Sequence, residues 1–152
     1  MRWKSPLLTT RFAAVDRSGD RGEAADVVAR VSATQASSAV ERLTEICRDL
    51  PECAIEGDQH LKVSVAGKTM GWLTVDHHGD GRISLSVRAP RGDNEALAAS
   101  DPDVFFMPPY VARHGYVGIH LDRPDVAWDE VRELVTDAYI LVAPKRLSNL
   151  IR

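Results

Sequence analysis

Cysteine, aromatic residues and long apolar runs are scarce in this sequence. Of its 152 residues, two are cysteines and 6% are aromatic. Cys47 and Cys53 are too few for a disulfide framework, so we expect a reduced, packed pair. No apolar run approaches the roughly 18 residues of a membrane span, and Lys4, Arg11 and Asp16 interrupt the stretch where a signal peptide would lie. We therefore expect a cytoplasmic protein that does not enter a membrane.

Recognisable catalytic motifs are also absent. The sequence contains no G-x-S-x-G, no G-x-G-x-x-G and no P-loop. One predicted turn gathers metal-binding residue types, namely Asp76, His77, His78 and Asp80. Because no further ligand follows at a recognisable spacing, we interpret this group as a polar hairpin tip and His120 as a packed or surface imidazole. The sequence thus predicts a non-catalytic protein without a metal or a cofactor.

An excess of basic residues is missing as well. The formal net charge is −3. Residues 1–35 hold six basic and four acidic side chains, which leaves a net charge of −5 for the rest of the chain. Proteins that bind nucleic acid through phosphates usually present a basic face, so any such face here must come from local clustering.

The composition is that of one soluble globular domain, with 44% hydrophobic and 27% charged residues. Residues 1–34 contain few large apolar side chains after Phe12, and the segment 16–22 is rich in Gly and charge. We expect residues 1–34 to form a flexible extension, with a possible short helix over 23–31, and residues 35–152 to form the folded domain.

Two kinds of periodicity follow one another in that domain. Ser38 and Glu41 have the spacing of a capping box, which predicts a helix from Ser38 to the residue before Pro51. Alternating polarity predicts strands near 61–65, 70–75, 83–87 and 116–121, with a hairpin turn at 66–68. A brief helix is expected near 95–98 and a longer one from 128 to Pro144. This order indicates an α+β fold in which helices pack on one face of a curved antiparallel sheet.

The last predicted helix carries two aromatic residues that can share one face. Trp128 and Tyr139 are about three helical turns apart. We expect both to anchor this helix to the sheet, and we expect the Pro108-Pro109-Tyr110 loop to lie close to that junction.

Several short segments in a fixed order resemble the MmcQ/YjbR family of small bacterial proteins. They are Leu43 to Pro51, Val65-Ala66-Gly67-Lys68 with Trp72, Leu85-Ser86-Val87-Arg88, Pro108-Pro109-Tyr110, Tyr116-Val117-Gly118-Ile119, and Ala138-Tyr139-Ile140-Leu141-Val142. The resemblance covers residues 38–147 and implies a compact CyaY-like, or double-wing, α+β fold that is commonly labelled DNA-binding. The chain departs from the family at Arg88, where Lys is usual, at Tyr116, where Trp is usual, and at Ala138, where Ser is usual.

Two binding functions remain open from the residues. For double-stranded DNA, the candidates that contact phosphates or bases are Lys68, Arg88, Arg91, Arg113, His114 and Tyr116, with Lys145 and Arg146 after the last helix. For a planar small molecule, an aromatic cleft would be formed by Trp72, Arg88, Met107, Tyr110 and Tyr116. Taken singly, Trp72, Phe105 and Phe106 also suit a hydrophobic core. A protein-interaction module that uses a sheet edge is a third possibility, and the sequence does not specify an oligomeric state.

Overall fold

The computed structural model describes residues 21–75 and 81–151, with side chains from residue 33 onward. Contacts divide the chain into two units, Met1–Gln35 and Ala36–Arg152, and the second unit is described below. The flexible extension predicted over residues 1–34 remains a prediction: residues 1–20 lie outside the described part, and residues 21–34 form the start of a long helix. The Asp76–Asp80 turn also lies outside the described part.

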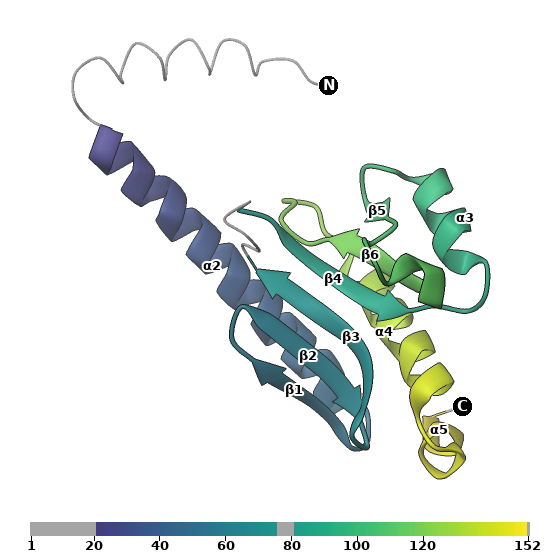
Figure 1. The fold of residues 1–152 in the computed structure, drawn as a ribbon. Helices are drawn as coiled ribbons and strands as arrows, with labels where there is room; N and C mark the ends of the chain where they lie inside the picture. The colour runs from purple at the N-terminus through teal and green to yellow at the C-terminus, as the bar shows by residue number, and fades with distance from the viewer. Residues whose placement is uncertain (1–20, 76–80, 152) are drawn as a thin grey trace. The chain divides into compact units, whose positions relative to one another are not determined.

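A six-stranded antiparallel sheet forms the centre of the second unit (Figure 1). In space its strands follow the order β1 (Cys53–Gly57), β2 (His60–Val65), β3 (Lys68–Val75), β4 (Ile83–Arg88), β6 (Tyr116–His120) and β5 (Phe105–Phe106). The helical elements are α2 (Arg21–Arg48), α3 (Asp93–Ser100), the 3-10 helix η2 (Ala112–His114), α4 (Trp128–Val142) and α5 (Lys145–Ile151). The expected α+β fold with an antiparallel sheet is confirmed.

Helix α2 is longer than its predicted counterpart. It begins at Arg21 and runs without interruption to Arg48, so Ser38 lies in its interior and does not cap its start. The reason is local: from Glu23 to Leu50 the sequence has no Gly or Pro that would end a helix. The predicted apolar face is correct, since Leu43, Ile46 and Cys47 are buried.

Alternation along the strands separates the two faces of the sheet. Leu73, Leu85 and Ile119 lie opposite one another across β3, β4 and β6, and all three are buried. They join one core with apolar side chains of α2, α4 and α5, and α4 contacts both β3 and β4. These helices therefore cover one face, which leaves the alternate residues of each strand on the other (Figure 1).

Helix α4 is anchored by the two aromatic residues expected. Tyr139 is fully buried, and its hydroxyl donates a hydrogen bond of 2.7 Å to the Pro51 carbonyl. Trp128 packs half-buried against the core, with the Arg42 guanidinium 5.7 Å from its ring. The expectation that Pro108-Pro109-Tyr110 lies at this junction is wrong, because that loop lies over the opposite face of the sheet.

Four elements were not predicted, and the 3-10 helix η2 is one of them. Strand β5 has only two residues, β1 carries Glu56 in a run of five, and α5 starts directly after the Pro144 that was expected to end the helical region. The predicted hairpin turn is correct: Ala66 and Gly67 both have positive φ, at 49° and 81°, as a two-residue turn with the twist of the strands requires.

Candidate functional site

The face of the sheet opposite the helices carries polar and aromatic side chains. They occupy the alternate positions of the strands and comprise His60, Lys62, Trp72, Thr74, Ser84, Ser86, Arg88, Tyr116 and His120. Register places them in rows across the strands, since Trp72 lies opposite Ser86 and Arg88 lies opposite Tyr116. We call this surface the polar face.

A cleft of about 560 Å³ lies between the polar face and the loop that follows β5. Its lining residues are His60, Trp72, Thr74, Arg82, Ser84, Ser86, Phe106, Pro108, Pro109, Tyr110, Val111 and His120. Aromatic and proline rings form its walls, and short hydroxyl side chains form its floor. The volume falls within the usual range for sites that bind small ligands.

One wall of the cleft is set by the closest approach between β5 and β6. Phe106 lies opposite Gly118, and a Cβ atom at position 118 would overlap the Phe106 ring. The ring therefore lies over the glycine and stacks on His120, with 4.5 Å between ring centroids and 21° between planes. Phe106 was assigned to the core from the sequence, whereas Phe105 is the core residue of this pair.

His120 is held as a neutral imidazole on the wall of this cleft. Burial lowers its pKa below the usual 6.5, and the charge of Arg82 lowers it further against the opposing effect of Asp122. An Arg82 nitrogen lies 3.0 Å from His120 Nδ1, while Arg82 Nε donates to Asp122 at 2.7 Å. Because arginine only donates, Nδ1 accepts and the ring proton resides on Nε2. His120 thus offers the cleft a hydrogen-bond donor.

The loop over the cleft is constrained by its backbone. Tyr110 has a positive φ of 69°, which is uncommon for a residue with a side chain. The Val111 amide bonds the Pro109 carbonyl at 2.8 Å, and the Ala112 amide bonds the Pro108 carbonyl at 3.0 Å. The Tyr110 side chain is 90% exposed at the mouth of the cleft, so a large ring is held in contact with solvent.

A chain of contacts leads from the cleft to the end of the sheet. The Trp72 and Tyr116 rings lie 5.4 Å apart, and the Arg88 guanidinium lies 5.8 Å from the Tyr116 ring. Burial raises the pKa of Tyr116, and the positive charge of Arg88 opposes that rise. Arg88 Nε is buried without a hydrogen-bond partner in the described structure. A buried donor of this kind is unusual.

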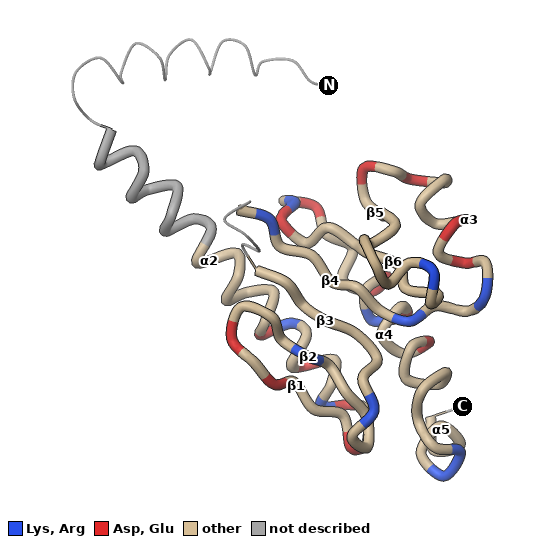
Figure 2. Tube along the Cα trace, viewed as in Figure 1, with Lys and Arg blue, Asp and Glu red and all other residues tan. Residues whose placement is uncertain are grey.

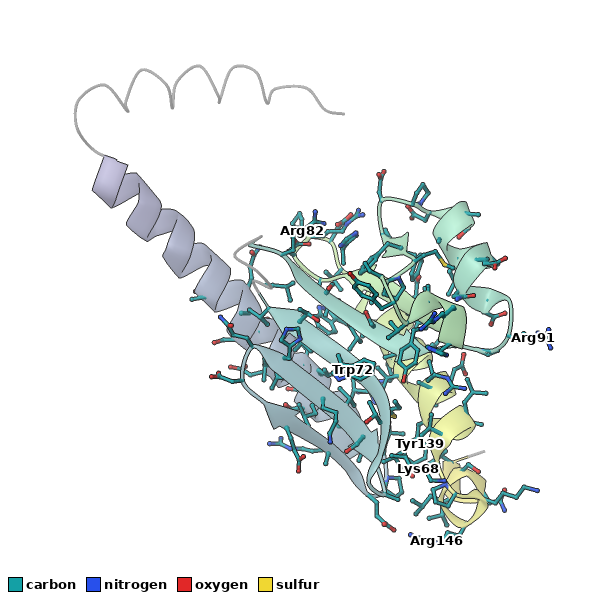
Figure 3. The ribbon with its side chains drawn as sticks, viewed as in Figure 1. Lys68, Trp72, Arg82, Arg91, Tyr139 and Arg146 are labelled. Carbon is teal, nitrogen blue, oxygen red and sulfur yellow. The ribbon has the colours of Figure 1, made fainter. Side chains whose placement is uncertain are left out.

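Basic residues gather at this end of the sheet, where β3 begins and β4 ends (Figure 2). Gly71 pairs with Val87 and Arg88 pairs with Tyr116, so the start of β3, the end of β4 and the start of β6 coincide. Register places Lys68 and Arg88 at this end of the sheet, and the segments after β4 and before β6 add Arg91, Arg113 and His114. We call these five residues the basic end. In Figure 3, Lys68 lies at the β2–β3 hairpin and Arg91 on the loop before α3, and both lie away from Arg82 at the start of β4.

A buried asparagine fixes two of these segments. Asn94 in the first turn of α3 is 6% exposed, and its side-chain nitrogen donates to the carbonyls of Ala112 and Tyr116 at 3.0 and 3.2 Å. It therefore ties the segment carrying Arg91 to the one carrying Arg113. Beyond this group, Arg146 forms an exposed ion pair with Glu52 through two hydrogen bonds of 2.6 and 3.1 Å.

The structure separates the predicted site residues into two neighbouring groups. Trp72 and Tyr110 line the cleft as proposed for a planar ligand, while Tyr116 lies between Trp72 and Arg88, which belongs to the basic end. Met107 precedes the cleft loop, is 40% exposed and does not line the cleft. Of the cations predicted for DNA, Lys68, Arg88, Arg91 and Arg113 occupy the basic end together with His114, whereas Lys145 and Arg146 lie in α5. Tyr116 is buried.

Sequence reasoning missed most of the cleft lining. Thr74, Ser84 and Ser86 alternate with buried apolar residues, and that alternation would have placed them on one shared face. No comparable signal marks Phe106 or His120, which resemble ordinary strand residues. In the described ranges, no group of three or more His, Cys, Asp or Glu side chains is arranged to hold a metal ion.

Comparisons with known proteins bear on the family and the fold. The YjbR family model matches residues 48–141. Among solved structures, Deinococcus radiodurans protein DR2400, with a domain described as DUF419, is similar with a TM-score of 0.57. It is 19% identical, and the match covers 67% of this chain and 76% of that chain, so the likeness shows the fold alone. No curated protein matches the chain. Within the described residues, no helix is both long and apolar enough to cross a membrane.

Proposed function

Since this chain belongs to the YjbR family, we propose that it is a non-catalytic DNA-binding protein that contacts phosphates through its basic end. The observation that carries this proposal is that Lys68, Arg88, Arg91 and Arg113 all lie at one end of the sheet. A chain with a net charge of −3 repels DNA overall, so only such local clustering can supply attraction.

The strength of the attraction follows from the number of phosphates neutralised. The basic end has four Lys and Arg side chains, but Asp93 lies two residues from Arg91 and offsets part of its positive charge. We therefore assume that three phosphates are neutralised. Release of their counterions makes the logarithm of the affinity for duplex DNA fall with a slope of about −0.9 per phosphate against the logarithm of salt. From 50 to 200 mM salt, the affinity should then fall about 40-fold.

Fluorescence anisotropy of a labelled duplex at these two salt concentrations tests the proposal. Arg91→Ala removes an exposed cation of the basic end and should lower the magnitude of the salt slope by about 0.9. Arg132→Ala removes an equal charge from α4, where Arg132 pairs with Asp49 at 2.9 Å, and serves as the matched control. Absence of salt-dependent binding at micromolar protein, or equal effects of the two substitutions, would contradict a DNA contact at the basic end.

The cleft favours a second candidate function, the binding of a free planar small molecule. Rings of Trp72, Phe106 and Tyr110 supply stacking surfaces, and burial of a flat ligand between them would be insensitive to salt. Saturation-transfer NMR with adenosine, which is planar and uncharged, distinguishes this function from phosphate binding. Binding of adenosine that persists in Arg91→Ala, in a protein that shows no affinity for DNA, would place this candidate ahead of DNA binding.

A further inference from the structure

The cleft and the basic end lie on one continuous surface. Trp72 lines the cleft, its ring contacts Tyr116, and Tyr116 lies beneath the guanidinium of Arg88 in the basic end. A strand whose phosphates contact the basic end therefore has a route to the cleft. The polar face thus combines cations for a backbone with aromatic rings for bases, which is the combination that single-stranded nucleic acid requires.

Register defines the shape of the cleft. Trp72, Ser86, Gly118 and Phe106 form one row across β3, β4, β6 and β5. Two aromatic residues at the ends of this row are three strand spacings apart, about 14 Å between backbones. The Phe106 ring covers Gly118, so the open position of the row is Ser86, which carries a short side chain. A flat ring can enter this space, whereas a stacked duplex cannot.

The floor and walls of the cleft suit the edge of a nucleobase. Thr74, Ser84 and Ser86 provide hydroxyl groups, which both donate and accept hydrogen bonds. His120 adds a donor at Nε2, as its contact with Arg82 implies. None of the described lining residues is acidic, so no carboxylate in the cleft repels a nucleotide. Hydroxyl groups accommodate more than one base, so this arrangement favours binding without strong sequence preference.

We propose that the cleft receives an unpaired nucleobase, so that the chain prefers single-stranded or locally unpaired DNA to an intact duplex. The proposal rests on the DNA-binding function and specifies the form of DNA that is bound. Phosphates contact the basic end, and one base leaves the stack to lie between the Trp72 and Phe106 walls, as in proteins that bind extruded bases. Stacking of one base on an aromatic side chain should raise affinity about 5- to 150-fold over a perfect duplex.

Three DNA probes test this preference in one anisotropy assay at fixed salt. They are a perfect duplex, the same duplex with a single bulged thymine, and a thymine single strand of equal length. The bulged duplex should bind at least about fivefold more tightly than the perfect one. Trp72→Ala should abolish that advantage without changing the affinity for the perfect duplex, whereas Arg91→Ala should weaken binding of every probe.

A second variant guards against a folding defect in Trp72→Ala. Ser86→Phe keeps Trp72 and fills the centre of the cleft, so it should abolish the same advantage, provided that circular dichroism shows a native fold. Quenching of tryptophan fluorescence by the thymine strand should be present in the wild type and absent in Trp72→Phe. This comparison is needed because the chain has three tryptophans, which include Trp128 on α4.

The outcomes separate the two proposals. Equal affinity for perfect and bulged duplexes, with Arg91→Ala weakening both, overturns the cleft proposal and leaves DNA binding by the basic end intact. Absence of salt-dependent binding to all three probes overturns both. Adenosine that binds as tightly as the bulged duplex would also overturn the cleft proposal, because the cleft would then serve a free small molecule.

Discussion

Truncation of Tyr139 should destabilise the fold without acting on the binding surface. Its ring is fully buried between α4 and the sheet, and its hydroxyl donates to the Pro51 carbonyl at 2.7 Å. Replacement of a buried aromatic residue by alanine leaves a cavity and lowers the free energy of unfolding by about 3–5 kcal/mol. Tyr139→Ala should therefore remove a large part of the total stability, which is about 5–15 kcal/mol for a typical domain.

The phenylalanine variant separates packing from hydrogen bonding. Tyr139→Phe keeps the ring and removes only the hydroxyl, so the Pro51 carbonyl loses its donor. That change should lower the free energy of unfolding by about 1 kcal/mol, the usual contribution of one such hydrogen bond. Tyr110→Ala is the matched control, because Tyr110 is 90% exposed and its truncation should change stability by less than about 0.5 kcal/mol.

Urea denaturation followed by circular dichroism measures all three variants. The midpoint concentration should fall strongly for Tyr139→Ala, slightly for Tyr139→Phe and hardly at all for Tyr110→Ala, with similar slopes. Tyr139→Phe should bind DNA as the wild type does. A Tyr139→Ala protein of wild-type stability that cannot bind DNA would refute this reasoning, since Tyr139 would then belong to the binding surface and not to the scaffold.

Two further predictions concern the cleft. Gly118→Ala places a Cβ where the Phe106 ring lies, so it should lower the free energy of unfolding by about 1–3 kcal/mol in the same urea assay; unchanged stability would show that the ring moves freely. The pKa of His120 in the folded state lies below 6.5, its usual value in an unfolded chain. Between these two pKa values the unfolded chain binds more protons than the folded one, so the free energy of unfolding should decrease as the pH drops from 6.5 toward the folded-state pKa. Urea midpoints at several pH values should show a smaller acid loss for His120→Asn, with Arg82, Asp122 and Arg123 still present in both proteins; identical pH profiles would contradict a role for His120.

Local patterns in the sequence were sufficient for the fold class and for most of the core. Alternating polarity identified β2, β3, β4 and β6, and helical spacing identified α4 with its buried Tyr139, because each pattern depends only on which side of one element is apolar. The helix start at Ser38 was wrong because a capping motif is only a local preference, and nothing upstream of it interrupts α2. Strand β5 escaped prediction because a two-residue strand exists only through its pairing with β6.

The candidate site was decided by tertiary structure. Sequence reasoning could propose Lys68, Arg88, Arg91 and Arg113 individually, but only strand register and the segments after β4 and before β6 bring them to one end of the sheet. The cleft depends on two further tertiary contacts. Phe106 fits because Gly118 lies opposite it, and the 108–111 segment lies over the polar face rather than beside α4. Residue types and their spacing along the chain thus determine which face of each element is apolar. Which of the remaining side chains become neighbours depends on strand pairing between distant segments, and a local pattern carries no information about that pairing.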